Sequence, residues 1–322
     1  MRVLLTGGGG FVARHVAVSL AGMLGDRLDL VVARRSESEA SLPQGRGVLL
    51  DITDRDAALD LIASVRPMAI IHLAGISDVS VAERNPELTW QVNLMGTLHL
   101  AHALKAHMPE GTFVFAGSSQ IYGSKPEEGR PFSERDLLKP MGQYGATKAA
   151  ADLALGALAA QGLRTIRFRP FNHIGPGQGA GFVVPSFAAQ IARIEAGLQP
   201  PVIKVGNLDA ERDFIDVRDV ARAYSLAVTQ AGSLPAGAMI NLASGHPTRI
   251  GQLLEGLIGL SSVPITVEVD PERVRPNDIR SLAGNADYAR ECLGWMPEIP
   301  LADTLRDILD EQRRAVRERP RA

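Results

Sequence analysis

The sequence contains one cysteine, Cys292, among 322 residues, so no disulfide can form within the chain. This scarcity is typical of a reducing compartment, and we expect a cytoplasmic protein. Long apolar runs are also missing, because no stretch approaches the ~20 apolar residues that a membrane-spanning helix needs. Glycines 7–10 break the apolar N-terminal segment directly after a strand-like run, so we interpret it as part of the fold and not as a signal peptide.

An excess of charge of one sign is missing as well, since 34 basic and 36 acidic residues give a formal net charge of −2. Such a balance provides no general attraction to the phosphates of nucleic acids or membranes, and we expect neither as a partner. The arginine-rich end, residues 313–321, is interpreted as a solvated helix terminus. Any site for an anion must therefore be local.

What the sequence does contain is an alternation of short apolar runs with longer helical patterns. Apolar runs without polar alternation are typical of strands buried on both faces of a sheet. The sequence therefore predicts an α/β protein with a Rossmann-like, doubly wound parallel sheet. The expected strands are Arg2–Thr6, Leu28–Ala33, Val48–Asp51, Met68–Leu73, Thr112–Ala116, Arg164–Phe168 and, after a helix at Val217–Val228, Ala238–Leu242.

Glycine- and proline-rich stretches such as 175–179 interrupt this period and predict a second, smaller lobe. We expect that lobe to bind the substrate over a cofactor-binding sheet. The NADP-binding domain then consists of residues 1–171 plus about 213–243, and the C-terminal substrate-binding lobe of residues 172–212 and 244–322. Trp90 and Trp295 are predicted to pack in the core or between the lobes, with Gly294-Trp295 ending a helix.

The first expected strand runs into Gly7-x-x-Gly10-x-x-Ala13, which is followed by a helical pattern from Phe11. Glycines permit a tight turn and let backbone N–H groups approach a pyrophosphate, which then lies at the positive end of the helix. Ala13 replaces the third glycine that often packs the helix on the strand. Between a strand and a helix, such a turn predicts a dinucleotide site, and an ordinary tight turn is the alternative.

The second expected strand leads to Arg34 and Arg35, where an NAD-preferring protein would usually offer an acid to the ribose hydroxyls. Guanidinium groups suit a 2′-phosphate, so the sequence favours NADP(H), with NAD(H) as a second candidate. Two arginines solvated in a loop are the alternative. The residues expected to contact the cofactor are Gly7, Gly10, Phe11, Val12, Arg34, Arg35, Asp51 and Ile52 near the adenine, Leu73, Ala74 and Gly75 near the pyrophosphate, Tyr144 and Lys148.

Tyr144 and Lys148 lie at the start of an alanine-rich helical segment, where their i, i+4 spacing places phenol and ammonium on one face. A free phenol has a pKa near ~10, and an adjacent cation favours its deprotonated form. The pair is therefore a candidate proton relay, although this spacing also occurs by chance on solvated helices. A strand ending at Ala116 leads to Ser118, which places a hydroxyl at the carboxyl edge of the sheet.

On these residues the chain resembles the extended short-chain dehydrogenases/reductases of the NAD-dependent epimerase/dehydratase family, over nearly its whole length. The resemblance implies that Ser118 holds the substrate oxygen, that Tyr144 is the acid or base, and that Lys148 also binds the nicotinamide ribose. Asn93 matches a structural asparagine of the family. Family members pair the Tyr144 helix into a four-helix bundle, and residues 149–160 are apolar around much of that helix, so we expect a homodimer.

Three segments of the second half resemble the GDP-mannose 4,6-dehydratases and the GDP-4-keto-6-deoxymannose reductases. They are residues 171–178, 190–197 and 205–214. The resemblance implies a GDP-sugar substrate, bound by the smaller lobe. The residues expected to contact this substrate are Ser119, Gln120, Asn172, Lys204, Arg212, Arg275 and Asp278.

A nucleotide diphosphate needs bidentate cations, and Arg212 and Arg275 in separate loops are suited to supply them. Residues 275–278 match a family loop that closes on the nucleotide. The alternative is that Arg212 pairs only with Asp213 or Asp216 in a structural network.

The choice between the two activities rests on Gln120. In the dehydratases a glutamate two residues after the catalytic hydroxyl residue removes the C5 proton of the 4-keto intermediate, and an amide cannot serve as that base. Ser118 and Gln120 are two apart in an expected extended segment, so Gln120 should face the sugar. The resemblance then implies NADPH-dependent reduction of GDP-4-keto-6-deoxy-D-mannose at C4, in which Tyr144 protonates the oxygen and GDP-D-rhamnose forms.

Three alternatives stay open. Binding of the ketone by its other face would give the C4 epimer, GDP-6-deoxy-D-talose. A GDP-mannose 4,6-dehydratase would need Glu127 or Glu128 to reach the site from the following loop. A non-catalytic NADPH-binding module is disfavoured by the presence of Ser118, Tyr144 and Lys148 together.

His99 and His102 form an i, i+3 pair with His107 nearby, which resembles the spacing of metal ligands. No cysteine or carboxylate completes the pattern, so we expect a solvated or packed helix face and no metal. His173 differs because it follows Asn172 in the expected substrate loop, where either side chain is placed to touch the sugar or the diphosphate.

Overall fold

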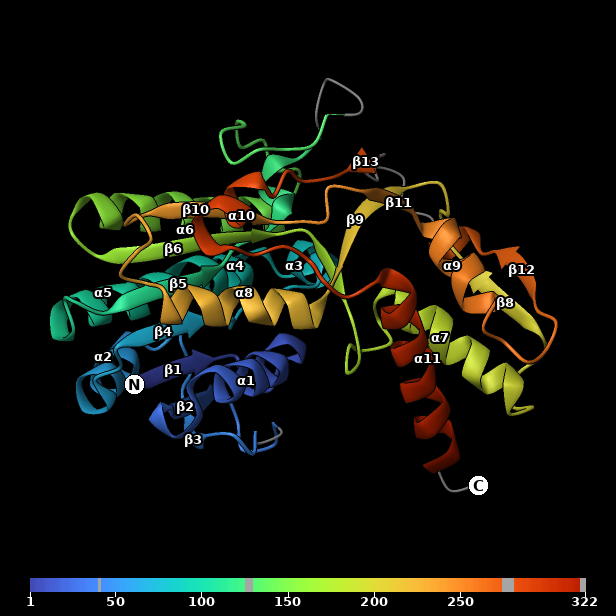
Figure 1. Ribbon diagram of the computed structural model, residues 1–322, viewed down its shortest axis with the longest axis horizontal. Helices are drawn as coiled ribbons and strands as arrows, with labels where there is room; N and C mark the ends of the chain where they lie inside the picture. The colour runs from blue at the N-terminus through green and yellow to red at the C-terminus, as the bar shows by residue number, and fades with distance from the viewer. Residues whose placement is uncertain (40–41, 125–129, 274–280, 319–322) are drawn as a thin grey trace.

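The computed structural model describes residues 1–39, 42–124, 130–273 and 281–318. Its centre is a seven-stranded sheet in the order β10-β6-β5-β4-β1-β2-β3, and every pairing in it is parallel. The strands are β1 (Arg2–Thr6), β2 (Asp29–Arg34), β3 (Arg46–Leu49), β4 (Ala69–His72), β5 (Thr112–Ala116), β6 (Arg164–Pro170) and β10 (Ala238–Leu242). Figure 1 shows this sheet with helices on both sides. The predicted α/β class and doubly wound parallel sheet are confirmed.

Helices cover both faces of the sheet because its strands are apolar on both faces. Val3 and Leu5 pack on one side with α1 (Phe11–Leu24), α8 (Val217–Thr229) and α10 (Asp287–Leu293). Leu4, between them, packs on the other side with α2 (Arg55–Val65), α5 (Thr97–His107) and α6 (Gln143–Ala160). Side chains that alternate between two buried layers explain why the sequence shows apolar runs without polar alternation.

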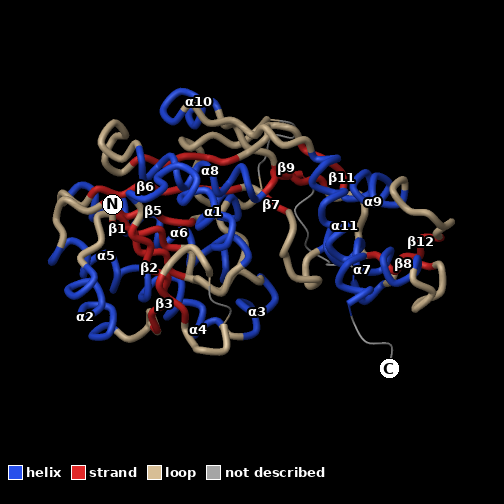
Figure 2. Tube along the Cα trace, turned by 60° about the horizontal axis from the view of Figure 1, so that its bottom comes forward, coloured by secondary structure: helices blue, strands red, loops and turns tan. Residues whose placement is uncertain are grey.

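A smaller lobe continues from the carboxyl ends of β6 and β10. Its strands are β7 (Asn172–Ile174), β9 (Glu211–Asp216), β11 (Pro247–Arg249) and β13 (Ser281–Leu282) in one sheet and β8 (Val202–Val205) with β12 (Thr266–Val269) in another. Its helices α7 (Val183–Glu195), α9 (Ile250–Ile258) and α11 (Leu301–Glu318) enclose a separate apolar core. Figure 2 shows α7, α9, α11, β8 and β12 gathered at one end of the large sheet.

Short elements complete the described part of the chain. They are α3 (Val79–Arg84), α4 (Pro86–Trp90), the π-helical segment η2 (Gln91–Gly96) and the 3-10 turns η1 (Gly25–Arg27), η3 (Ser119–Tyr122) and η4 (Pro271–Arg273). Within the described ranges, no helix combines the length and the apolar character needed to cross a membrane.

The two tryptophans differ. Trp295 is fully buried and donates its indole N–H to the Asp219 carbonyl at 2.8 Å, after Gly294 ends α10 in the left-handed conformation. The prediction of a packed Trp90 is wrong, because its side chain is 37% exposed and Thr89 is the buried residue of α4. The Trp90 indole N–H donates to the Gln143 side chain at 2.9 Å.

The arginine-rich end is not wholly solvated. Arg313 on α11 donates from two guanidinium nitrogens to the Glu195 carboxylate of α7, each at 2.8 Å, because these two helices pack along each other. The interpretation of this region as a solvated terminus is therefore wrong for Arg313. The residue bounds of the two lobes stay a prediction. α10 and Trp295, which that prediction assigns to the smaller lobe, pack in the core of the large sheet.

Candidate active site

The turn between β1 and α1 forms a backbone cradle. Gly7 has φ +75°, and a Cβ there would lie 2.8 Å from the Ala74 nitrogen. The Gly10 N–H donates to the Gly7 carbonyl at 2.9 Å, and Gly10 caps α1 without any side-chain bond to the helix. The first N–H groups of a helix have no partner within it, so those that follow Gly10, at Phe11 and Val12, suit a pyrophosphate.

Ala74 and Gly75, directly after β4, form the opposite wall of this cradle. A Cβ on Gly75 would lie 2.9 Å from Asn93 Oδ1 and 3.4 Å from Lys148 Nζ. Asn93 fixes the segment, since its Oδ1 accepts from the Ile76 N–H at 2.8 Å and its Nδ2 donates to the Ile76 carbonyl at 3.1 Å. This geometry agrees with the structural role implied for Asn93.

The two arginines after β2 have different environments. Arg34 donates from Nη1 to the Glu39 carbonyl at 2.6 Å, and a Cβ on Gly47 of β3 would lie 3.3 Å from its Nη2. Arg35 is exposed and acts electrostatically on Asp51. Arg35 is therefore the more accessible of the two cations, while Arg34 is bonded to the loop at Glu39.

Asp51 and Ile52 follow β3 at the same edge of the sheet. Asp51 Oδ1 accepts from the Thr53 hydroxyl at 2.7 Å and from the Thr53 N–H at 2.9 Å, and these bonds hold the pKa of Asp51 below its usual range. Ile52 is buried, and its side chain lies close to Gly96. Their contact with an adenine stays a prediction.

Ser118, Tyr144 and Lys148 meet beyond the end of β5. The Tyr144 hydroxyl lies near the buried Ser118, whose hydroxyl favours the phenolate. Lys148 is 5% exposed and donates from Nζ to the Ala116 carbonyl at 2.8 Å, with the Phe115 ring 5.1 Å away. The strand end and the first turns of α6 thus bring the three side chains together.

The protonation of this group is governed by burial. Burial lowers the pKa of Lys148 to about 8. Desolvation also raises the pKa of Tyr144, and the Ser118 hydroxyl opposes that rise only in part. In the protein alone the pKa of the phenol therefore moves opposite to the expected direction, because desolvation is the largest cause.

Gln120 does not lie in an extended segment, and that prediction is wrong. Ser118 is extended, but its Oγ accepts the Gln120 N–H at 3.1 Å and caps the 3-10 turn η3, in which Ser119 and Gln120 lie. Gln120 still lies beside the catalytic helix, because a Cβ on Gly145 would be 2.8 Å from the Gln120 carbonyl. Ser119 is buried behind it.

The expected substrate residues of the smaller lobe come from three strands. Asn172 lies on β7 and pairs with Phe214 of β9, Arg212 lies two residues earlier on β9, and Lys204 lies on β8. Arg212 is buried and donates to the Glu211 carbonyl at 2.7 Å.

The two acids considered as structural partners of Arg212 are engaged elsewhere. Asp213 accepts from Ser244, Gly245 and Gly284, and Asp216 accepts from Arg218 and Thr304. Arg275 and Asp278, like Glu127 and Glu128, lie outside the described residues.

A cavity of about 340 Å³ opens beside Lys204. Its other lining residues are Ser186, Gln190, Gln199, Pro200, Val202 and Arg273. The Gln190 amide bonds the Lys204 N–H at 3.0 Å and the Lys204 carbonyl at 3.3 Å, and the Lys204 side chain is exposed.

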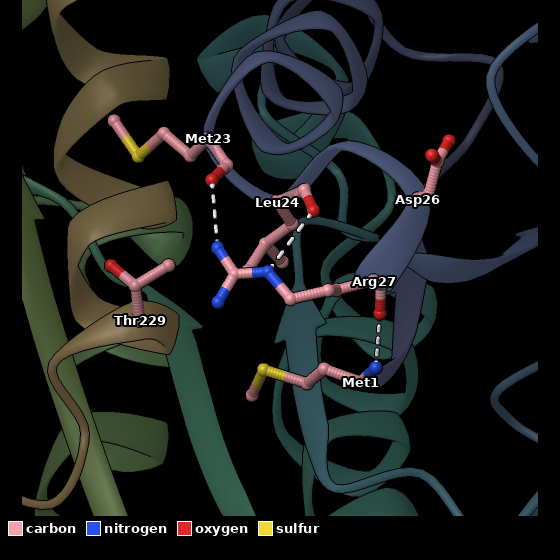
Figure 3. A pocket seen from close by; sticks show the side chains of 6 residues that line it. All are labelled: Met1, Met23, Leu24, Asp26, Arg27 and Thr229. Carbon is pink, nitrogen blue, oxygen red and sulfur yellow. Dashed lines mark hydrogen bonds between the residues drawn. The ribbon is translucent and has the colours of Figure 1, made fainter.

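A second cavity, of about 790 Å³, lies at the amino end of β1, away from the glycine turn. It is lined by Met1, Met23, Leu24, Asp26, Arg27 and Thr229 (Figure 3). Arg27 donates to the Leu24 and Met23 carbonyls at 3.4 and 3.5 Å, so its guanidinium caps the end of α1. This cavity is remote from the catalytic side chains and belongs to no site predicted from the sequence.

No group of three or more His, Cys, Asp or Glu side chains in the described ranges is arranged to hold a metal ion. His99 bonds through Nδ1 to the Ile52 carbonyl at 3.1 Å, so its ring packs at the α5 face next to the predicted adenine pocket.

Comparison with known proteins agrees with this geometry. The model of the NAD dependent epimerase/dehydratase family matches residues 3–243. The chain belongs to this family.

Two relatives of this family member have named activities. GDP-6-deoxy-D-mannose reductase of Pseudomonas aeruginosa is 38% identical over 318 residues, which cover 98% of this chain and 99% of the relative. GDP-mannose 4,6 dehydratase 2 of Arabidopsis thaliana is 30% identical over 269 residues, covering 81% of this chain and 70% of the relative.

Solved structures of similar proteins share this fold. RMD from Pseudomonas aeruginosa complexed with NADPH superposes with a TM-score of 0.83 at 35% identity, covering 98% of this chain and 99% of that one. The Thermus thermophilus UDP-glucose 4-epimerase complexed with NAD has a TM-score of 0.85 at 26% identity, covering 97% and 99%.

Two features of this family member have no signal in its sequence. A buried chain links β1, β4 and α5, with Thr6 Oγ1 2.7 Å from His72 Nδ1 and His72 Nε2 3.0 Å from Thr97 Oγ1. The Phe11 ring, at the cofactor turn, is parallel to the His173 ring at 6.3 Å between centroids. Both depend on residues distant in sequence, which spacing along the chain does not show.

Proposed function

We propose that this chain is an NADP(H)-dependent oxidoreductase that reduces the C4 ketone of GDP-4-keto-6-deoxy-D-mannose to GDP-D-rhamnose. One observation carries the proposal: Ser118, Tyr144 and Lys148 meet beside the glycine cradle, in a chain that aligns along nearly its whole length with a GDP-6-deoxy-D-mannose reductase. A cytoplasmic location is part of the proposal and rests on the single cysteine.

The chemistry of the three side chains suits a reduction. NADPH, when bound, supplies the hydride for the sugar C4. Tyr144 gives its phenolic proton to the oxygen of that carbon, and Ser118, which lies near Tyr144, holds the same oxygen. Lys148, with its ammonium near Gly75, stabilises the phenolate that remains and binds the nicotinamide ribose.

The residues of the cradle fit a dinucleotide. A Cβ at Gly7, Gly8 or Gly9 would lie 2.8 Å or less from protein atoms, so only glycine fits this turn, and a glycine backbone can approach a pyrophosphate closely. The exposed Arg35 supplies charge for a 2′-phosphate, as the NADPH complex of a similar protein suggests. NAD(H) is proposed as the second cofactor.

Gln120 supports a reductase over a dehydratase. A dehydratase needs a base for the C5 proton, and the residue two positions after Ser118 is an amide next to the start of α6. We keep the GDP-mannose 4,6-dehydratase as the second candidate because such enzymes are also relatives of this chain. The C4 epimer, GDP-6-deoxy-D-talose, is the alternative product of the same reduction.

The decisive experiment supplies purified protein with GDP-4-keto-6-deoxymannose and either NADPH or NADH. We expect oxidation of the nicotinamide with equal formation of a deoxyhexose, which NMR identifies as the rhamno or talo epimer. A parallel incubation with GDP-mannose and oxidised cofactor should give no 4-keto sugar. Formation of that keto sugar would replace the reductase with the dehydratase.

The variant Tyr144→Phe separates catalysis from binding. It should lower turnover by at least ~10²-fold, since a general acid typically contributes that much, and leave NADPH affinity nearly unchanged. Fluorescence titration with NADPH measures the second quantity. Equal turnover of Tyr144→Phe and the wild type would remove Tyr144 from the mechanism, and a wild type without turnover would favour the non-catalytic module.

We further propose a homodimer through a four-helix bundle that includes α6. Ala151, Leu155 and Leu158 of α6 pack on the sheet. The outer side of the same helix is apolar as well, with Leu153, Ala157 and Ala160 exposed. An apolar outer stripe on a helix whose inner face is already buried supports contact with a second copy.

A further inference from the structure

The loop after β2 brings a carboxylate to the glycine cradle. A Cβ on Gly9 would lie 2.6 Å from Glu39 Oε2 and 2.9 Å from Glu39 Cβ. The same Oε2 is 3.4 Å from the Arg35 N–H, which points to it. Glu39 therefore lies between the turn that suits the pyrophosphate and the arginine that suits a 2′-phosphate.

The position of Glu39 is fixed by the arginine that precedes it. Arg34 donates to the Glu39 carbonyl at 2.6 Å, and its guanidinium lies across Gly47 of β3. On the other side, the Gly8 N–H donates to the Ala33 carbonyl at 3.0 Å and ties the cradle to the end of β2. Cradle, strand end and loop thus form one surface, with Glu39 at its centre.

In dinucleotide folds the end of the second strand meets the adenosine ribose. An acid there accepts hydrogen bonds from the 2′-hydroxyl, and an arginine accommodates a 2′-phosphate. In this chain β2 ends at Arg34, which is not an acid. Glu39, five residues later in the loop, places a carboxylate near the exposed Arg35. An acid and an arginine therefore lie close together beyond the end of β2.

We propose that Glu39 sets the cofactor preference: its carboxylate accepts the 2′-hydroxyl of NADH and opposes the 2′-phosphate of NADPH, while Arg35 attracts that phosphate. The inference rests on the proposed use of a nicotinamide dinucleotide. Glu39 would thus provide an affinity for NADH that Arg34 and Arg35 alone would not provide, and it would lower the ratio of NADPH affinity to NADH affinity.

The test measures binding of two fragments, 5′-ADP and 2′,5′-ADP, by calorimetry, so no sugar and no turnover are needed. In Glu39→Gln the affinity for 2′,5′-ADP should rise by about two- to fivefold, the size expected for partly exposed charges. The affinity for 5′-ADP should fall or stay constant. Because the effect is electrostatic, the rise should shrink as salt increases from low to physiological concentration.

Glu37→Gln is the matched control, since Glu37 is an exposed glutamate of the same loop. It should leave the ratio of the two affinities unchanged. The inference is wrong if Glu39→Gln changes both affinities by one factor, or if Glu37→Gln changes their ratio equally. Glu39→Ala repeats the test without the amide. In Glu39→Gln the ratio of kcat/KM for NADPH to kcat/KM for NADH should rise by a similar factor. If the protein shows no turnover, that result contradicts the proposed function and leaves the binding test of Glu39 valid.

Discussion

Lys148 and Tyr144 show how one buried environment shifts the pKa values of a cation and a phenol in opposite directions. Burial makes the ammonium easier to deprotonate, with a pKa of about 8, and makes the phenol harder to deprotonate. A phenol that keeps its proton at neutral pH suits an enzyme that must give a proton to a ketone. The reverse oxidation would need the phenolate, so this environment favours reduction.

The pKa of Lys148 predicts a pH limit for the reaction. A lysine is charged below its pKa, so a pKa lowered to about 8 means that the charge is lost as pH rises through that value. His72, whose pKa burial lowers to about 3, stays neutral across this range. The kcat/KM for the keto sugar should be level from pH 6 to 7.5 and then fall by up to about tenfold per pH unit.

The control for this profile is Lys148→Arg, which keeps its charge at every accessible pH. It should react more slowly, but without the fall near pH 8. A wild-type profile that stays level to pH 9.5 would show that Lys148 keeps its proton and that its environment differs from the one described.

At this scale the sequence predicts positions better than environments. Ser118, Tyr144 and Lys148 come together as expected, because a strand end and a helix start fix them through the backbone. The pKa of Tyr144 moves opposite to expectation, since burial by surrounding side chains has no signature in the spacing. Gln120 does not follow the predicted extended conformation, because its backbone N–H donates to the Ser118 hydroxyl and the chain turns there.

Among the elements, the turn from β1 into α1 depends most strictly on its residue types. Gly7 combines φ +75° with the backbone of Ala74 at 2.8 Å from any added Cβ. Gly22, in the same helix α1, has nothing within 4 Å of an added Cβ. Replacement by alanine should therefore have opposite effects on stability at the two glycines.

Gly7→Ala should lower the free energy of unfolding by about 1–3 kcal/mol and weaken NADPH binding, because a positive φ and a backbone clash act together. Gly22→Ala should raise it by about 0.5–1 kcal/mol, because alanine loses less freedom than glycine in a helix. Urea denaturation measures both. Equal stabilities for the two variants would show that the turn is not held as described.

The elements themselves divide into two groups by how well the sequence predicts them. β1, β5 and β10 begin and end where expected, since buried parallel strands are apolar throughout. The strands of the smaller lobe, such as β11 with three residues and β13 with two, escape prediction. They are too short to show a period, and their pairing with β9 joins segments far apart in the chain.

For the whole molecule, the outer surfaces of the two helical layers matter most. Leu153 on α6 is 62% exposed and Val18 on α1 is 57% exposed, on opposite sides of the sheet. Leu153 continues into the exposed Ala157 and Ala160, whereas Val18 lies in the layer that the proposed bundle leaves uncovered. An unpaired apolar residue is ordinary on a surface, but a stripe along a helix is not.

Leu153→Arg should therefore convert the dimer to a monomer. Burial of a leucine is worth about 1.5–3 kcal/mol, and a two-fold interface contains each residue twice. The change should therefore weaken association by at least about 3 kcal/mol, or over 10²-fold. Val18→Arg, the matched control, should leave the dimer intact. Light scattering at micromolar concentration distinguishes the two. A monomeric wild type would remove the proposed bundle, and dissociation by Val18→Arg would place the interface on the α1 side of the sheet.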